Sequence, residues 1–170
     1  MLTQVTPASP GVALRRVVQM GAGGAGAAVA HALLSEGVEQ LSIFEVDPSR
    51  AQALVDNLNG HFGNGRAVVG SDLASEVSAA DGLVNTTPVG MAKLPGMPLP
   101  AQYLHAGLWV AEIVYFPLET ELLKEARALG CRTLDGGTMA VFQAVKAFEL
   151  FSGVAADAAR MQAHFHSMNG

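Results

Sequence analysis

Short apolar runs alternate with longer amphipathic segments along most of this chain. The apolar runs predict six strands, at residues 16–20, 41–44, 67–69, 82–85, 109–113 and 132–134. The segments between and after them predict helices over 25–35, 48–58, 73–79, 119–129, 138–151 and 155–166. Val68-Val69 and Val110-Ala111 show no polar alternation, which is typical of strands that are buried on both faces.

Strands that alternate with helices predict right-handed crossovers and a parallel sheet with helices on both sides. We therefore expect an α/β fold of the Rossmann-like, doubly wound type with three layers. A length of 170 residues suits one domain with its own core. We assign residues 15–170 to this domain and interpret residues 1–14 as an N-terminal remnant or linker. Ligands of such folds bind at the carboxyl ends of the strands.

Composition excludes several classes of protein. No segment approaches the roughly 18 to 20 uninterrupted apolar residues of a membrane span, and the start lacks the pattern of a signal peptide. The single cysteine, Cys131, excludes an internal disulfide and fits a reducing cytoplasm, where we expect the protein. A net charge of −5 with scattered lysines and arginines argues against nucleic acid. His164 and His166 point about 200° apart on a helix, so we expect no metal site.

A glycine-rich turn, GAGGAG at residues 21–26, joins the first predicted strand to the first predicted helix. In dinucleotide-binding proteins the first glycine allows a tight turn, the second admits the pyrophosphate and the third permits close helix–strand packing. Gly21, Gly23 and Gly26 occupy these three positions. The helix that follows directs free N–H groups and the positive end of its dipole at the phosphates. The strand–turn–helix order therefore predicts a dinucleotide site.

Glu45 predicts which dinucleotide binds. It stands at the end of the second predicted strand, 19 residues after Gly26, where a carboxylate can accept hydrogen bonds from the adenosine ribose. The same carboxylate would repel the 2′-phosphate of NADP, which carries roughly −1.5 to −2 charges. The next residue is Val46, at a position where an NADP enzyme could carry a phosphate-binding arginine. We therefore predict NAD in preference to NADP.

Asp47 and Arg50 follow at the start of the second predicted helix, and each allows two interpretations. Asp47 precedes Pro48, which fits an N-cap followed by proline at the first helical position. Contact with the ribose is its second possible role. Arg50 either lies over the adenine or is solvated.

Three further stretches of sequence, beyond the glycine-rich turn, are distinctive. They read NTTPVGM at 85–91, YFPLETELL at 115–123, and DGGTM at 135–139, which leads to Gln143 and to FELFSG at 148–153. In this order they resemble the C-terminal half of the shikimate dehydrogenase family, in particular its NAD-using quinate/shikimate branch. The resemblance runs from about Val17 to the C-terminus. It implies reversible hydride transfer between a nicotinamide cofactor and the C3 hydroxyl or ketone of shikimate, quinate or their 3-dehydro forms.

The resemblance also implies a role for particular residues. Those expected to bind the cofactor's pyrophosphate are Gly21, Ala22, Gly23, Gly24 and Ala25, and those at its adenosine end are Glu45, Asp47 and Arg50. Those expected beside its ribose and nicotinamide are Asn85, Thr86, Thr87, Ile113 and Gly136. Tyr115 and Gln143 are expected to contact substrate hydroxyls.

Three of these residues also have structural interpretations. Gln143 is polar within an apolar helix and needs a partner if it is buried, but it could simply be solvated. Tyr115 could pack in the core with its hydroxyl at the rim. Asn85 could end its strand through a side-chain turn.

One part of the family pattern has no counterpart in these 170 residues. Family members carry a preceding substrate domain, with a catalytic Lys–Asp pair that handles the proton of the reacting hydroxyl. No stretch of residues 1–14 resembles it, so we treat the substrate domain as absent and assign no catalytic residue. Lys93 is the lysine nearest the expected cleft, but a lysine on a loop is ordinarily just solvated.

We therefore expect a chain that binds NAD and catalyses poorly unless a substrate domain is supplied. Apolar groups that would face that domain could instead drive formation of a homo-oligomer. A non-catalytic NAD-binding regulatory module is the alternative function. A different dinucleotide enzyme is a third, which the motif at 115–123 and Gln143 disfavour.

Overall fold

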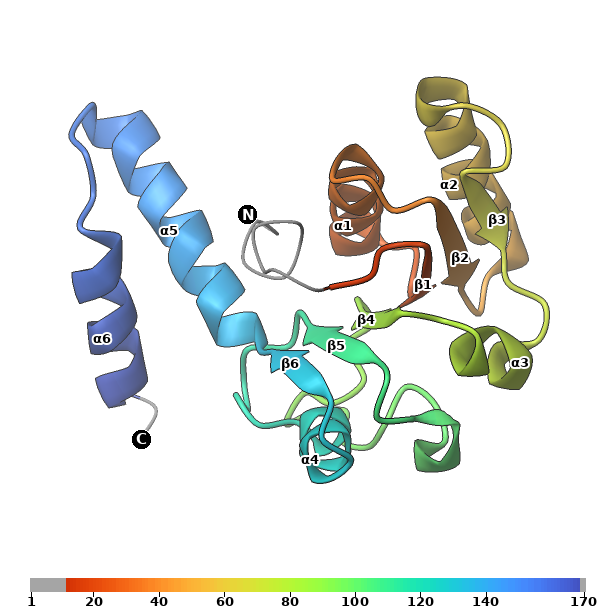
Figure 1. The fold of residues 1–170 in the computed structure, drawn as a ribbon. Helices are drawn as coiled ribbons and strands as arrows, with labels where there is room; N and C mark the ends of the chain where they lie inside the picture. Colours follow the sequence, from red (N-terminus) through yellow and green to blue (C-terminus); the bar gives the residue numbers. More distant parts are fainter. Residues whose placement is uncertain (1–11, 169–170) are drawn as a thin grey trace.

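The computed structural model describes residues 12–168 and has a six-stranded parallel sheet at its centre (Figure 1). The strand order is β3-β2-β1-β4-β5-β6. Their bounds are β1 (Arg16–Met20), β2 (Gln40–Phe44), β3 (Ala67–Val69), β4 (Gly82–Asn85), β5 (Trp109–Glu112) and β6 (Arg132–Leu134). The order reverses between β1 and β4, so the predicted doubly wound sheet is confirmed, and ligands of such sheets bind at this switch point.

Helices cover both faces of the sheet, which confirms the three layers. In Figure 1, α1 (Gly24–Ser35) and α2 (Pro48–Phe62) lie on one face, and α3 (Leu73–Ser78) and α4 (Glu121–Ala128) lie on the other. Two further helices, α5 (Gly136–Ser152) and α6 (Ala158–Met168), follow β6 and pack against each other. A short 3₁₀ helix, η1 (Ala101–Tyr103), precedes β5.

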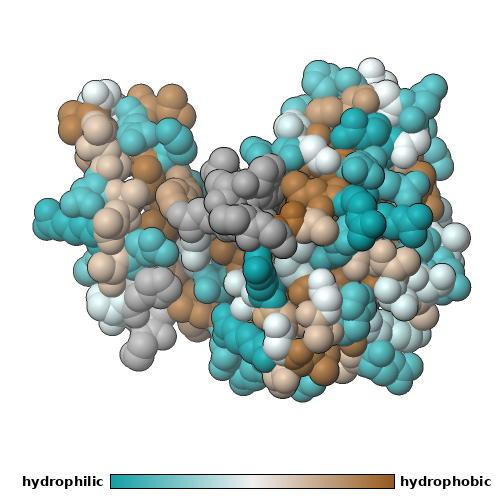
Figure 2. Space-filling model, in the orientation of Figure 1, coloured by the Kyte–Doolittle hydropathy of each residue, from teal (hydrophilic) through white to brown (hydrophobic). Residues whose placement is uncertain are grey.

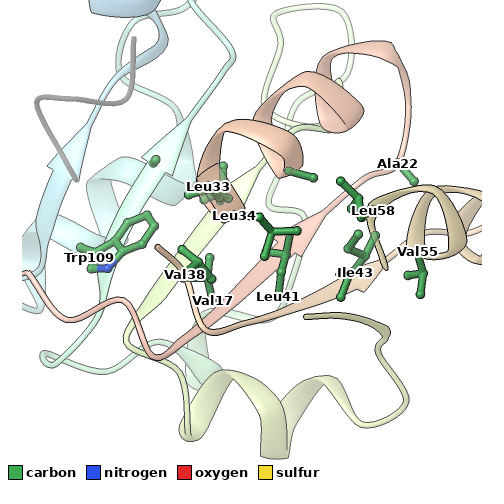
Figure 3. Packing of buried hydrophobic residues seen from close by; sticks show 14 residues of the cluster. Val17, Ala22, Leu33, Leu34, Val38, Leu41, Ile43, Val55, Leu58 and Trp109 are labelled. Atoms are coloured by element: carbon green, nitrogen blue, oxygen red, sulfur yellow. The ribbon is translucent and has the colours of Figure 1, made fainter. Parts of the chain in front are cut away.

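Successive residues of β1 feed opposite layers of the core. Val17 packs with side chains of α1 and α2, whereas Val18 packs with those of α3 and α4, and both are almost fully buried. Figure 3 shows the first layer, which contains Leu33 and Leu34 of α1 and Leu41 of β2. Because side chains alternate between the two faces of a strand, each strand residue points into one layer or the other. This is why most residues of the central strands are apolar.

Trp109 closes the same layer at the β5 side. Its ring occupies the space that a side chain at residue 82 would need, so β4 can start only with glycine there. The indole Nε1–H donates to the carbonyl of Ala13 at 3.0 Å. The segment that enters β1 is thereby attached to the sheet two strands away.

The helices α5 and α6 form an arm that stands beside the β6 edge of the sheet (Figure 1). Hydrophobic side chains are visible on its surface in Figure 2, and Leu150 and Phe151 at the end of α5 are 82% and 92% exposed. Exposed apolar side chains of this size commonly mark contacts with another protein surface. Within residues 12–168, no helix combines the length and apolar character that a membrane span requires.

Some helix ends differ from the prediction for identifiable reasons. The helix α2 continues to Phe62 and ends at Gly63, whose φ is +102°. Its last turn is held by Asn59, whose side chain exchanges two 2.9 Å hydrogen bonds with the backbone of Ala67. The helix α4 begins two residues later than predicted because Thr120 caps it, accepting from Leu123 N–H. These caps depend on neighbours that the apolar pattern does not reveal.

Candidate functional site

The glycine-rich turn has the geometry that its spacing predicts. Gly21 has φ +98°, a conformation that favours glycine, and its N–H donates to Phe44 O at 2.7 Å. A Cβ at Gly26 would lie 2.6 Å from Gly21 O and 2.8 Å from Thr86 Oγ1. Gly26 therefore permits α1 to start directly against the strand below it.

Two side chains hold this turn from beneath. Gln19 is fully buried, and its Nε2 donates to Gly21 O at 2.9 Å and Gly26 O at 3.0 Å. The hydroxyl of Thr86 donates to Met20 O at 2.7 Å and Gly21 O at 3.0 Å. Gln19 was not among the predicted site residues, although a polar residue inside an apolar strand was a visible signal. The Thr86 hydroxyl serves the turn rather than pointing into open space.

The first turn of α1 is open to a ligand. Its N-cap is Gly23, which has no side chain to bond the free N–H groups, and a Cβ at Gly23 or Gly24 would meet no atom within 4 Å. An uncapped helix start presents several N–H donors and the positive end of the helix dipole. The arrangement can therefore accept a phosphate group.

Glu45 links the end of β2 to this turn. Its carboxylate accepts from Ala22 N–H at 2.8 Å and from the N–H groups of Val46 and Asp47 at 2.9 and 3.3 Å. Partial burial opposes ionisation, but these three backbone hydrogen bonds and the charge of Arg50 hold its pKa below the ordinary value. Glu45 is thus an ionised acceptor beside the turn. Glu45 also lines the adjoining hollow.

Asp47 caps α2, as one of its two interpretations predicts. Its Oδ1 accepts from the N–H groups of Ser49 and Arg50 at 3.0 and 3.3 Å and from the Ser49 hydroxyl at 2.6 Å. The Ser49 hydroxyl, followed by the N–H of Arg50, lowers the pKa of Asp47. Arg50 lies 4.0 Å from its other oxygen and lines the hollow beside Glu45. The carboxylate is therefore committed mainly to the helix start.

We expect substitution of Asp47 to separate capping from ligand contact. Asp47→Ala should lower the urea midpoint, because the first N–H groups of α2 lose their acceptor. Asp47→Asn should restore the midpoint, since an asparagine oxygen also caps helices. Calorimetry should give the same NAD affinity for both variants and the unmutated chain. Weaker NAD binding by the stable Asn variant would show that the charge contacts the ligand.

A groove runs across the carboxyl ends of the central strands in two connected hollows. One, of about 580 Å³, contains Glu45 and Arg50, and the other, of about 650 Å³, contains Lys93 and Tyr115. Both share Gly23 and the segment 86–88. The predicted site residues that line the groove are Gly21, Gly23, Gly24, Ala25, Glu45, Arg50, Thr86, Thr87, Ile113 and Tyr115. Ala22, Asp47, Asn85, Gly136 and Gln143 do not line either hollow.

A buried polar network that was not predicted from the sequence lies at the ends of β4 and β5, beside Thr87 and Val114 of the second hollow. Glu112, 2% exposed at the end of β5, accepts from Asn85 Nδ2 at 3.0 and 3.1 Å, Val114 N–H at 3.1 Å and the Thr120 hydroxyl at 3.2 Å. Burial raises the pKa of Glu112, and these hydrogen bonds oppose that rise. Asn85 also accepts from Thr87 N–H at 3.0 Å and Thr87 Oγ1 at 2.7 Å. Asn85 thus positions Thr87 through a side-chain turn.

Gly136 and Gln143 lie on α5, which begins against the segment that follows β5. A Cβ at Gly136 would overlap the carbonyl groups of Ile113 and Val114, so only glycine lets α5 begin against the β5 loop. Gln143 lines a separate, largely apolar hollow of about 130 Å³ between α1 and α5. Ala25 and Ile113 border both this hollow and the groove. Gln143 therefore stands near the groove and outside it.

The described residues support neither a metal site nor a reactive cysteine. Residues 12–168 contain no group of three or more histidine, cysteine, aspartate or glutamate side chains that could hold a metal ion. Cys131 is buried, its Sγ contacts His105 O at 3.3 Å, and burial raises the pKa of the thiol. A thiol in this state is a poor nucleophile.

Known proteins share both this sequence and this fold. The chain is 59% identical over 163 residues to the NADP-dependent shikimate dehydrogenase of Streptomyces avermitilis, covering 95% of this chain and 56% of that protein. It is 51% identical over 162 residues to the NAD-dependent quinate/shikimate dehydrogenase of Corynebacterium efficiens, covering 94% and 57%. The chain is a homologue of the shikimate and quinate dehydrogenases. No protein-family model matches it.

A solved structure of this homologous group supports the same assignment. Quinate dehydrogenase from Corynebacterium glutamicum in complex with NAD superposes with a TM-score of 0.90 at 46% identity. The superposition covers 98% of this chain and 58% of that one. The chain thus spans somewhat more than half the length of the shikimate and quinate dehydrogenases that it matches.

Proposed function

We propose that this chain is the nicotinamide-dinucleotide-binding half of a shikimate or quinate dehydrogenase. The observation that carries the proposal is the uncapped start of α1, which opens onto a groove at the switch point of the sheet. The homology to oxidoreductases named for NAD or NADP supports it. When bound, the cofactor would supply a hydride acceptor or donor.

The residues fit a dinucleotide laid along the groove. The open N–H groups at Gly23, Gly24 and Ala25 suit a pyrophosphate at the middle of the groove. The hollow beside Glu45 and Arg50 suits the adenosine end. The hollow lined by Thr87, Ile113 and Tyr115 suits the nicotinamide, with the substrate beyond it. In this arrangement Tyr115, which is 55% exposed, is available to bond a substrate hydroxyl.

We further propose that NAD is preferred to NADP, because of Glu45. Its pKa is lowered, so it stays ionised at neutral pH, where it would accept from ribose hydroxyls and repel a 2′-phosphate. Val46 is 98% exposed and offers no positive charge. Arg50 is the cation nearby, and it lies 4.0 Å from the carboxylate of Asp47. The relatives include enzymes named for each cofactor, so the proposed preference rests on Glu45 and Val46 and not on their names.

We expect calorimetry to give at least about tenfold tighter binding of NAD than of NADP, a difference of about 1.4 kcal/mol. Glu45→Gln should reduce that ratio toward unity, because the amide removes the charge that repels the 2′-phosphate. Glu125→Gln, at an exposed site on α4, is the matched control and should leave the ratio unchanged. Equal affinities in the unmutated chain would refute the preference for NAD. Failure to bind either dinucleotide would refute the proposed function itself.

A further inference from the structure

Glu112 is a buried acid that the proposed binding of the cofactor does not use. One of its donors, the N–H of Val114, belongs to a residue that lines the hollow where we place the nicotinamide. A second partner, Asn85, holds Thr87, which lines the same hollow. The carboxyl is therefore linked, directly or through Asn85, by hydrogen bonds to two residues that line the space where we place the nicotinamide ring.

Burial raises the pKa of Glu112, and its hydrogen-bond partners oppose that rise because they favour the ionised form. Asn85 Nδ2, the N–H of Val114 and the Thr120 hydroxyl all donate to it. No lysine, arginine or histidine among residues 12–168 lies within 4 Å of this carboxyl to pair with it. The charge is thus held by dipoles and is not neutralised by a cation. Charges in such surroundings act over longer distances than charges in water do.

The two redox forms of the cofactor differ in charge where this carboxylate lies. The oxidised nicotinamide ring carries a positive charge, whereas the reduced ring is neutral, and the rest of the dinucleotide is the same. We propose that the buried carboxylate of Glu112 selectively stabilises the oxidised dinucleotide in the groove relative to the reduced one. This inference rests on the proposed function. It adds a residue that sets the balance between the two bound forms without touching them.

The test compares dissociation constants of NAD⁺ and NADH for the 170-residue chain and its Glu112→Gln variant, in mildly alkaline buffer. Glutamine keeps the size of the side chain and an acceptor oxygen but removes the charge. We expect the variant to lose affinity for NAD⁺ relative to NADH by at least about fivefold, which corresponds to about 1 kcal/mol. ADP-ribose, which lacks the nicotinamide ring, should bind both proteins alike.

Matched variants distinguish charge from structure. Glu112→Asp keeps the charge, so its NAD⁺/NADH ratio should stay near that of the unmutated chain even if both affinities fall. Thr120→Val removes one donor and makes the charge less favourable, so it should shift the ratio in the same direction as Glu112→Gln. It serves as the second variant if Glu112→Gln does not fold, with Thr120→Ser as its control.

Equal losses of NAD⁺ and NADH affinity in Glu112→Gln would overturn the inference and leave Glu112 a purely structural residue. An unchanged ratio in both Glu112→Gln and Thr120→Val would overturn it as well. If the unmutated chain bound none of NAD⁺, NADH and ADP-ribose, both the proposed function and this inference would fail. Binding of all three with an unshifted ratio would contradict the role of Glu112 alone.

Discussion

We expect the 170-residue chain, mixed with NAD and either shikimate or quinate, to give no measurable reduction of NAD. In the groove, the hollow assigned to the nicotinamide contains one lysine, Lys93, and no carboxylate side chain among its lining residues. Proton transfer by a positioned group typically contributes about 10²- to 10⁴-fold to a rate, and positioning of the substrate contributes further. Absorbance of the reduced cofactor measures the reaction directly.

Supplying the remaining half of a shikimate or quinate dehydrogenase, fused or as a separate chain, should restore turnover. The control is the same mixture with a Gly26→Ala chain, which should stay inactive. Turnover by the 170-residue chain alone at rates of about 1 s⁻¹ or more would contradict this account. Lys93→Ala would then show whether that amine acts as the base.

Among substitutions that add one methyl group to a glycine of the turn, Gly26→Ala should lower stability and NAD affinity the most. The added carbon would lie within 3 Å of both Gly21 O and Thr86 Oγ1, so α1 must move away from β1. Overpacking of this kind costs about 1 to 3 kcal/mol of unfolding free energy. NAD affinity should fall more than tenfold, because the turn and the N–H groups of α1 shift together. Urea denaturation and calorimetry measure the two effects separately.

Gly60→Ala provides the matched control within α2. A Cβ at Gly60 would meet no atom within 4 Å, so the substitution should raise stability by about 0.5 to 1 kcal/mol, as alanine favours helices. It should leave NAD binding unchanged. If Gly26→Ala bound NAD as well as Gly60→Ala does, the turn would not be the phosphate site.

The sheet was predictable because most residues of its central strands are buried on both faces and apolar. Four of the six predicted strands, 16–20, 67–69, 82–85 and 132–134, have the observed bounds. The turn at 21–26 was predictable because the positions of its glycines follow from local sterics. Homology-based roles for Tyr115 and Gln143 remain predictions, since both need a substrate to test them.

The supports of the site were not predictable, because they join segments that are distant in sequence. Thr86 bonds the carbonyl of Met20, 66 residues away, and Asn85 bonds Glu112, 27 residues away. Periodicity describes one element at a time and carries no information about such pairs. Gln19 and Glu112 did give one local signal, a polar residue among apolar strand neighbours. That signal indicates burial with a partner, but it does not say which partner.

Trp109 is the single tryptophan of the chain, and its hydrogen bond to Ala13 O makes it an optical reporter of the junction that leads into β1. Its emission should shift to longer wavelength when that junction detaches, well before the sheet itself unfolds. A chain that begins at residue 15 should show the shifted spectrum while remaining folded. Any larger protein that includes this chain would carry the same reporter, so the order in which its parts assemble can be followed without an added dye.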